Sequence, residues 1–232
     1  MSKSLAQPIL RPVHLVAPPE PSHASHPTAP DILAAVRAFD RPEGANTTTM
    51  SAYLCPVFLK QALEVIARDA HQTKQHTVAA TLDLGLRCLH HFPGVAECLD
   101  AQQTLLRESR NAYVRRWLEE TVAIDLLTGG LGHTKFTVRV ALAQHREVGR
   151  LAGALGVKLG QCFTLALTAT LIGSPYVPMA EANDAMFATL VDLKHRCVAR
   201  AHHMEMLRNA PEPTVATVHR TIYDVLRGHL GR

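Results

Sequence analysis

The stretch from Lys135 to Ile172 constrains the fold of this chain more than any other. Residues 135–140 alternate polar and apolar side chains, which is the period of a strand with one buried face. Two helical patterns follow on either side of Gly156-Val157; the first is amphipathic and the second is mostly apolar. Because a lone strand has no partner for its backbone hydrogen bonds, this strand must pair with another one.

A weaker copy of this strand-helix-helix pattern lies upstream, around Ser51 to Leu89. A shift of 85 residues, without a gap, superposes the apolar positions of the two helix pairs, although few of the residues are identical. The sequence therefore predicts an internal repeat. The superposed pairs are Leu63 with Val148, Ile66 with Leu151, Ala67 with Ala152, Ala70 with Leu155, Val78 with Phe163, Leu82 with Leu167 and Leu86 with Leu171.

The two strands do not superpose under the same shift. The ungapped shift would place the apolar alternate positions between residues 50 and 54 on the polar face. A slip of one residue instead places Thr49, Ser51 and Tyr53 there, because a strand has a period of two and one step turns every side chain over. We expect the slipped register.

Composition is that of a globular protein with an intracellular setting. Of 232 residues 47% are hydrophobic and 19% charged, and a net charge of +4 permits nucleic-acid binding without requiring it. Five cysteines without a C-x-x-C pair predict reduced thiols in a cytoplasmic protein. The N-terminus lacks the apolar run of a secretory signal, and no stretch is long enough for a membrane span.

Motif searches favour neither an enzyme nor a metalloprotein. The chain has no H-E-x-x-H, no zinc-type Cys/His spacing and no phosphate-binding G-x-x-x-x-G-K-[ST] motif. The adjacent histidines at 90–91 and 202–203 point about 100° apart on a helix and rarely chelate together. We therefore expect no catalytic residues, no metal site and no cofactor.

Five segments follow from these patterns. Residues 1–45 are rich in proline and predict a disordered arm with a short helix near residues 31–39. Residues 46–95 and 131–175 form the first and second repeat units, and 96–130 form a linking helix. Residues 176–232 form two C-terminal helices, separated by prolines 211 and 213.

The second unit, especially residues 155–161 (LGVKLGQ), resembles the ribbon-helix-helix (Arc/MetJ-type) family of DNA-binding proteins. The resemblance implies a mainly α fold with a short two-stranded antiparallel ribbon, here a tandem pseudo-dimer within one chain, carrying extra helices. It also implies that the ribbon reads bases of double-stranded DNA in the major groove, and that the second helix of each unit starts at a phosphate. The base-reading residues would be Lys135, Thr137, Arg139, Thr49, Ser51 and Tyr53, and the phosphate-binding residues Thr73, Lys74 and Lys158.

The layout of a proline-rich arm before two such units resembles, more loosely, the accessory proteins of T-DNA and plasmid transfer. That resemblance implies a role beside a relaxase or other transfer proteins at a transfer origin. Three alternatives stay open. The chain is a transcriptional repressor or a plasmid partition or copy-control regulator of the same fold, or a helical scaffold that binds only protein, or residues 135, 137 and 139 are an ordinary solvated strand face.

Overall fold

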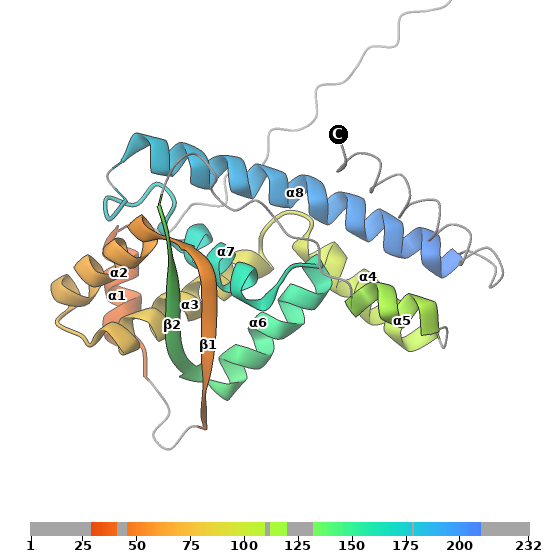
Figure 1. Cartoon of the computed structure of the whole chain (residues 1–232), viewed down its shortest axis with the longest axis horizontal. Helices are drawn as coiled ribbons and strands as arrows, with labels where there is room; N and C mark the ends of the chain where they lie inside the picture. The colour runs from red at the N-terminus through yellow and green to blue at the C-terminus, as the bar shows by residue number, and fades with distance from the viewer. Residues whose placement is uncertain (1–28, 41–45, 110–111, 120–131, 178, 210–232) are drawn as a thin grey trace, which may run out of the picture.

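Two strands that lie far apart in the sequence pair to form one antiparallel ribbon among the helices (Figure 1). The computed structural model describes residues 29–40, 46–109, 112–119, 132–177 and 179–209, and within these ranges the chain is mainly helical. The elements are α1 (Ala29–Ala38), β1 (Thr47–Pro56), α2 (Val57–Ala70), α3 (Lys74–His90), α4 (Val95–Glu108), α5 (Ala112–Glu119), β2 (His133–Ala141), α6 (Leu142–Leu155), α7 (Leu159–Leu171) and α8 (Ala180–Asn209).

The register of the ribbon explains why strands and helices follow different offsets. Ser51 lies opposite Thr137, which is 86 residues further along the chain, whereas the helices repeat at 85. Between Ala52 and Cys55 the register is irregular: β1 advances three residues there while β2 advances two. One extra residue in one strand is a β-bulge, so the slip expected from the side-chain chemistry has a structural cause.

The helix pairs of the two units coincide in bounds and in caps. α2 and α6 start at residues 57 and 142 and end at 70 and 155, so both bounds differ by 85. α2 is followed by His71 and α6 by Gly156, both left-handed with φ of 57° and 65°, and each N–H bonds two carbonyls of the last turn. Thr73 and Lys158 then begin α3 and α7 at the same offset. Both segments therefore form the same elements in the same order.

The centre of the core is the crossing of α3 and α7. Residues 162–171 of α7 are all buried, as the mostly apolar sequence of this helix requires. Gly85 permits the close approach, because a Cβ there would lie 2.1 Å from the carbonyl oxygen of Ala166. Thr170 donates its hydroxyl to the Thr81 carbonyl of α3 across the crossing (3.2 Å). The two helices are thus held backbone to backbone.

The first helix corrects the predicted extent of the disordered arm. Within residues 1–45, α1 is an ordered helix whose Ile32 and Val36 are fully buried in the core. A ring nitrogen of His76 lies 2.8 Å from the Val36 carbonyl, and Arg37 donates to the Asp69 carbonyl at 3.0 Å. The helix predicted near residues 31–39 is therefore confirmed, and residues 29–38 do not belong to a disordered segment. Residues 1–28 and 41–45 lie outside the described ranges.

The remaining helices form a second layer against the end of α6. The linking helix predicted over residues 96–127 is instead two helices, α4 and α5, and its last part lies outside the described residues. α8 runs along α4: the Cys98 thiol donates to the Cys197 carbonyl at 3.0 Å, and Arg208 pairs with Glu108 at 2.6 Å. The helix predicted after residue 213 also lies outside the described ranges.

An ion cluster ties α3 to α6 and gives stability a dependence on pH. Arg150 donates to both Glu147 oxygens (3.0 and 2.7 Å), and a His90 ring nitrogen lies 2.5 Å from one of them. The bonds from Arg150, followed by the bond from His90, lower the pKa of Glu147. A lowered carboxyl pKa stabilises the fold above the unfolded-state pKa, and this contribution is lost as pH falls through the folded-state pKa.

We expect Glu147→Gln to lower the free energy of unfolding by about 1 kcal/mol at pH 7, and by progressively less towards pH 3. Urea unfolding of both proteins across that pH range measures the difference. The matched control is Asp192→Asn in α8, whose carboxylate pairs only with Arg196 on its own helix. A Glu147→Gln effect that does not change with pH would contradict the linkage.

Candidate nucleic-acid interface

Five of the six residues predicted to read bases lie on one face of the ribbon. Thr49, Lys135, Thr137 and Arg139 are exposed, and Ser51 is half-buried. Thr49 lies opposite Arg139 and Ser51 opposite Thr137, so residues from both strands share this outer face. The sixth residue, Tyr53, lies at the irregularity between Ala52 and Cys55, and its side chain is outside the described part of the structure.

The inner face of the ribbon fixes which side chains point outward. Met50, Ala52, Val138 and Val140 are buried against the helices, and Phe136 packs its ring 5.9 Å from that of Phe163 in α7. Turning either strand over would expose these apolar side chains and bury charged ones, at several kcal/mol. The outward direction of the polar set is therefore a consequence of the core.

A hydrogen bond marks the middle of the outer face, and a cation lies toward each end. The hydroxyl oxygens of Ser51 and Thr137 are 3.0 Å apart. Lys135 and Arg139 each lie two residues from Thr137, on opposite sides, so their Cα atoms are separated by about 13 Å of extended chain. Both cations belong to β2, whereas the described outer face of β1 offers hydroxyl groups.

The residues predicted to bind phosphate in the first unit lie at the start of α3. The Thr73 hydroxyl accepts from the His76 N–H at 3.2 Å and so caps the helix. Lys74 donates to Glu64 of α2 at 2.8 Å, and this bond lowers the pKa of the Glu64 carboxyl. Lys74 is 71% exposed, so a stronger anion can compete with Glu64 for it.

The start of α7 in the second unit is built differently. Lys158 is exposed at the N-cap, and its backbone N–H donates to the Gln161 side chain at 3.2 Å. Gly160 packs against the ribbon, since a Cβ there would lie 2.8 Å from the Ser51 carbonyl oxygen. α7 therefore meets β1 directly at this point.

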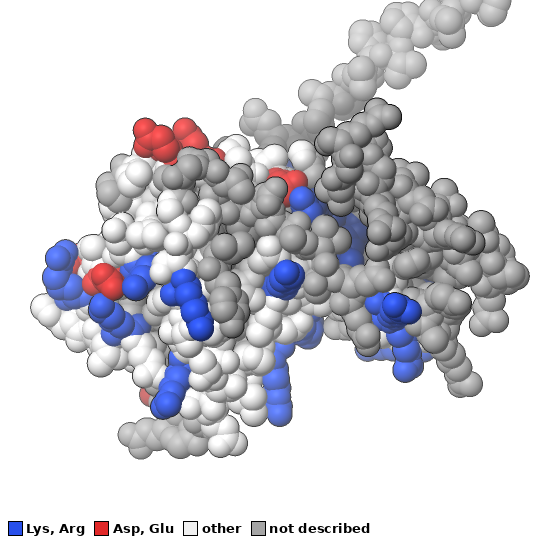
Figure 2. All heavy atoms as spheres, viewed as in Figure 1, with Lys and Arg blue, Asp and Glu red and all other residues white. Residues whose placement is uncertain are grey.

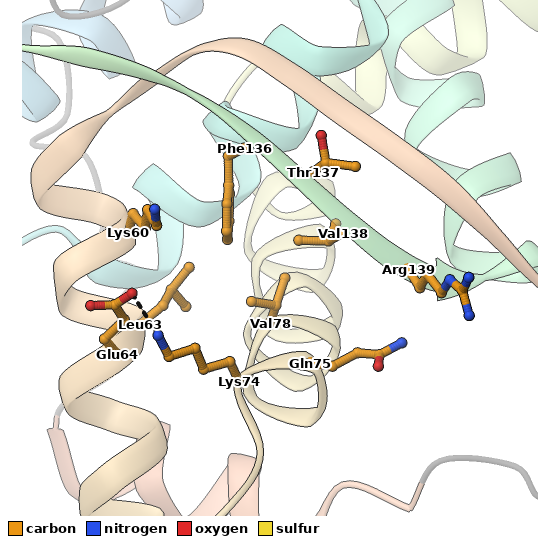
Figure 3. A pocket seen from close by; sticks show the side chains of 10 residues that line it. All are labelled: Lys60, Leu63, Glu64, Lys74, Gln75, Val78, Phe136, Thr137, Val138 and Arg139. Atoms are coloured by element: carbon orange, nitrogen blue, oxygen red, sulfur yellow. Dashed lines mark hydrogen bonds and ion pairs between the residues drawn. The ribbon is translucent and has the colours of Figure 1, made fainter.

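On the side of the first unit, a hollow of about 410 Å³ separates β2 from α2 and the start of α3 (Figure 3). Pattern reasoning missed it, because a gap between elements leaves no periodic signal. Lys60 and Glu64, spaced by four residues, read as an ordinary solvated helix face. The lining residues are Lys60, Leu63, Glu64, Lys74, Gln75, Val78, Phe136, Thr137, Val138 and Arg139.

The charge distribution favours an anionic partner on the face that carries the ribbon. Figure 2 shows lysine and arginine side chains spread over that face, while a group of acidic side chains lies over the start of α8. Among the described residues, no three His, Cys, Asp or Glu side chains are grouped to hold a metal ion. Within the same ranges no single helix is long and apolar enough to cross a membrane; α6 and α7 pass that test only as a pair, bent by 99°.

Comparisons with known proteins add no relative. No protein-family model, no curated protein and no solved structure shows significant similarity to this chain. The functional argument therefore rests on the geometry of the chain itself.

Proposed function

We propose that this protein binds double-stranded DNA by placing the β1–β2 ribbon in the major groove, as a ribbon-helix-helix pseudo-dimer formed within one chain. The observation that carries the proposal is the pairing of β1 with β2, which gives one ribbon an exposed polar face and a buried apolar face. The major groove is about 12 Å wide and admits a two-stranded ribbon. The matching helix pairs, which flank the ribbon at an offset of 85 residues, support the same architecture.

The distribution of side chains suggests how bases are read. Arg139 offers two donors to guanine O6 and N7, and Lys135 offers one ammonium group at the other end of the ribbon. Thr49, Ser51 and Thr137 add hydroxyls that donate or accept. Because one half carries Arg and the other Lys, the preferred site is asymmetric rather than a palindrome.

Phosphate contacts position the ribbon in this proposal. The starts of α3 and α7 direct backbone N–H groups and a positive dipole outward, near Lys74 and Lys158. The biological setting that we propose is assistance to a relaxase in plasmid or T-DNA-type transfer. Repression and plasmid partition or copy control would use the same surface. Genes for a relaxase or a coupling protein beside this one would distinguish transfer from control.

The decisive experiment selects a preferred duplex from a random library and then measures affinity by fluorescence anisotropy. We expect Arg139→Ala to lose about 1–3 kcal/mol and to relax base preference in one half of the site, and Lys135→Ala to relax the other half. Lys74→Ala should weaken all sequences alike and reduce the salt dependence. Lys194→Ala on α8, where Lys194 is equally exposed, is the matched control and should leave affinity unchanged.

Absence of binding to any duplex at about 50 mM salt would overturn the proposal, because backbone contacts are strongest at low salt. One observation favours the alternative of a protein-binding scaffold. α8 exposes Phe187 (62%) and Val198 (58%), which are large apolar side chains for a free surface. A chain that binds no DNA but loses a protein partner on Phe187→Ser would support the scaffold.

A further inference from the structure

The hollow beside the ribbon combines an apolar floor with a cationic edge. Leu63 and Val78 form the floor and are 3% exposed, and Phe136 and Val138 point into the space from β2 (Figure 3). Its volume of about 410 Å³ lies within the range typical of small-molecule sites. An open apolar floor of this size favours a ligand with an apolar body.

The edge of the hollow selects the charge of that ligand. Lys60 reaches from α2 toward Phe136, and Lys74 and Gln75 come from the start of α3 (Figure 3). Glu64 offsets one of the two ammonium groups, since it pairs with Lys74 at 2.8 Å. The balance of these groups is positive, and the N-terminal dipole of α3 adds to it.

We propose that the hollow binds a small organic anion, an aromatic or branched carboxylate whose apolar body covers Leu63, Val78, Phe136 and Val138 and whose carboxylate pairs with Lys60 and Lys74. A phosphate of a DNA duplex needs only the cationic edge and has no apolar part to fill the floor. The equivalent position to Lys60 in the second unit, 85 residues further on, is His145, and there Gly160 brings α7 directly against β1. The site is therefore built on one side of the ribbon only.

Occupation of this site should release DNA, a consequence that rests on the proposed function. Thr137 and Arg139 line the hollow and also belong to the outer face of the ribbon. The carboxylate would take Lys74 away from a DNA phosphate and place a negative charge beside the ribbon. The ligand thus acts as an anionic effector that weakens DNA binding.

The test uses the full chain and two probes of matched shape, 2-naphthoate and the neutral 2-naphthalenemethanol. Nitrogen-15 NMR should show amide shifts over residues 60–64, 74–78 and 136–139 with 2-naphthoate, and much smaller shifts with the alcohol. Lys60→Ala should raise the Kd for 2-naphthoate about fivefold, corresponding to loss of about 1 kcal/mol. Glu64→Gln should lower the Kd, because it frees Lys74. His145→Ala is the matched control in the second unit and should change nothing.

Two results would overturn the site: no shifts in the lining residues at about 1 mM probe, where binding is worth about 4 kcal/mol, or equal binding of acid and alcohol. Fluorescence anisotropy with labelled DNA tests the regulatory part, since 2-naphthoate should raise the Kd for DNA in the parent protein but not in Lys60→Ala. A chain that binds 2-naphthoate at these residues but no duplex refutes the DNA proposal and leaves the site standing. A chain that binds DNA but no probe refutes the site alone.

Discussion

Gly85→Ala is expected to lower the free energy of unfolding by about 3 kcal/mol, although alanine is the better helix former. A Cβ at position 85 would lie 2.1 Å from the Ala166 carbonyl oxygen and 2.7 Å from the Thr170 hydroxyl oxygen. The first of these atoms is helix backbone, which cannot rotate away as a side-chain end can. α3 and α7 would have to separate, and overpacking of this kind typically costs 1–3 kcal/mol or more.

The matched control is Gly149→Ala, in the middle of α6. A Cβ there would meet only Leu159 Cδ1, at 3.9 Å, which is an ordinary contact. This substitution should stabilise the protein by up to about 1 kcal/mol through helix propensity. Urea unfolding followed by circular dichroism measures both variants. Equal effects of the two substitutions would show that α3 and α7 do not cross as closely as the structure has them.

The same crossing connects stability to the proposed function. α7 packs against β1 and α3 against β2, so the spacing of the two helices sets the support under both strands. A separation of α3 from α7 would therefore disturb the ribbon even where the protein stays folded. In Gly85→Ala, DNA affinity should fall at temperatures where Gly149→Ala still binds like the parent.

Helices with strong periodicity could be predicted from the sequence almost to the residue. The expected helix over residues 57–70 coincides with α2, because its apolar side chains repeat at 3.6 and Pro56 marks its start. α3 begins at Lys74, four residues earlier than its first apolar side chain suggests, and α7 begins at Leu159 rather than Phe163. Periodicity detects the buried face, and the polar first turn of α3 has none.

The pairing of the ribbon could be predicted, but its bulge could not. Side-chain chemistry required Thr49 and Ser51 outside and Met50 inside, and the structure has them so. The sequence left the position of the extra residue open, because any residue between the strand centre and Pro56 would restore the helix offset. The hollow depends on how far α3 stands from β2, which no local pattern encodes.

Arg200 is the clearest case of a residue whose role no sequence pattern announces. It lies in α8 between ordinary helix formers, yet its guanidinium donates to the carbonyls of Ala154 (2.7 Å) and Gly153 (3.1 Å) at the end of α6. It also stacks 4.5 Å from the centre of the Trp117 ring in α5. Burial lowers the pKa of this guanidinium, which stays charged at neutral pH. One side chain thus joins three helices.

Arg200→Ala should therefore lower the free energy of unfolding by about 3 kcal/mol. Two charged hydrogen bonds to carbonyls are lost, each worth about 1.5 kcal/mol or more, and the ring contact adds about 0.5–2 kcal/mol. Part of this loss is recovered because a buried cation no longer has to be desolvated. Arg196→Ala, one turn earlier on α8, is the control; it removes only an exposed pair with Asp192 and should cost about 0.5 kcal/mol.

The measurement has a local probe, because Trp117 is the only tryptophan of the chain. Its ring stacks on His203 at 4.5 Å on one side and on Arg200 on the other, so its emission reports how α5 packs against α8. We expect Arg200→Ala to shift that emission in the folded protein, and Arg200→Lys to retain the charge but little of the stability, because an ammonium group cannot span two carbonyls and a ring. If Arg200→Ala were no more destabilising than Arg196→Ala, the attachment of α8 to α6 would depend on apolar contacts alone. In that case Leu193→Ala and Met204→Ala, which truncate buried side chains of α8, should carry the loss instead.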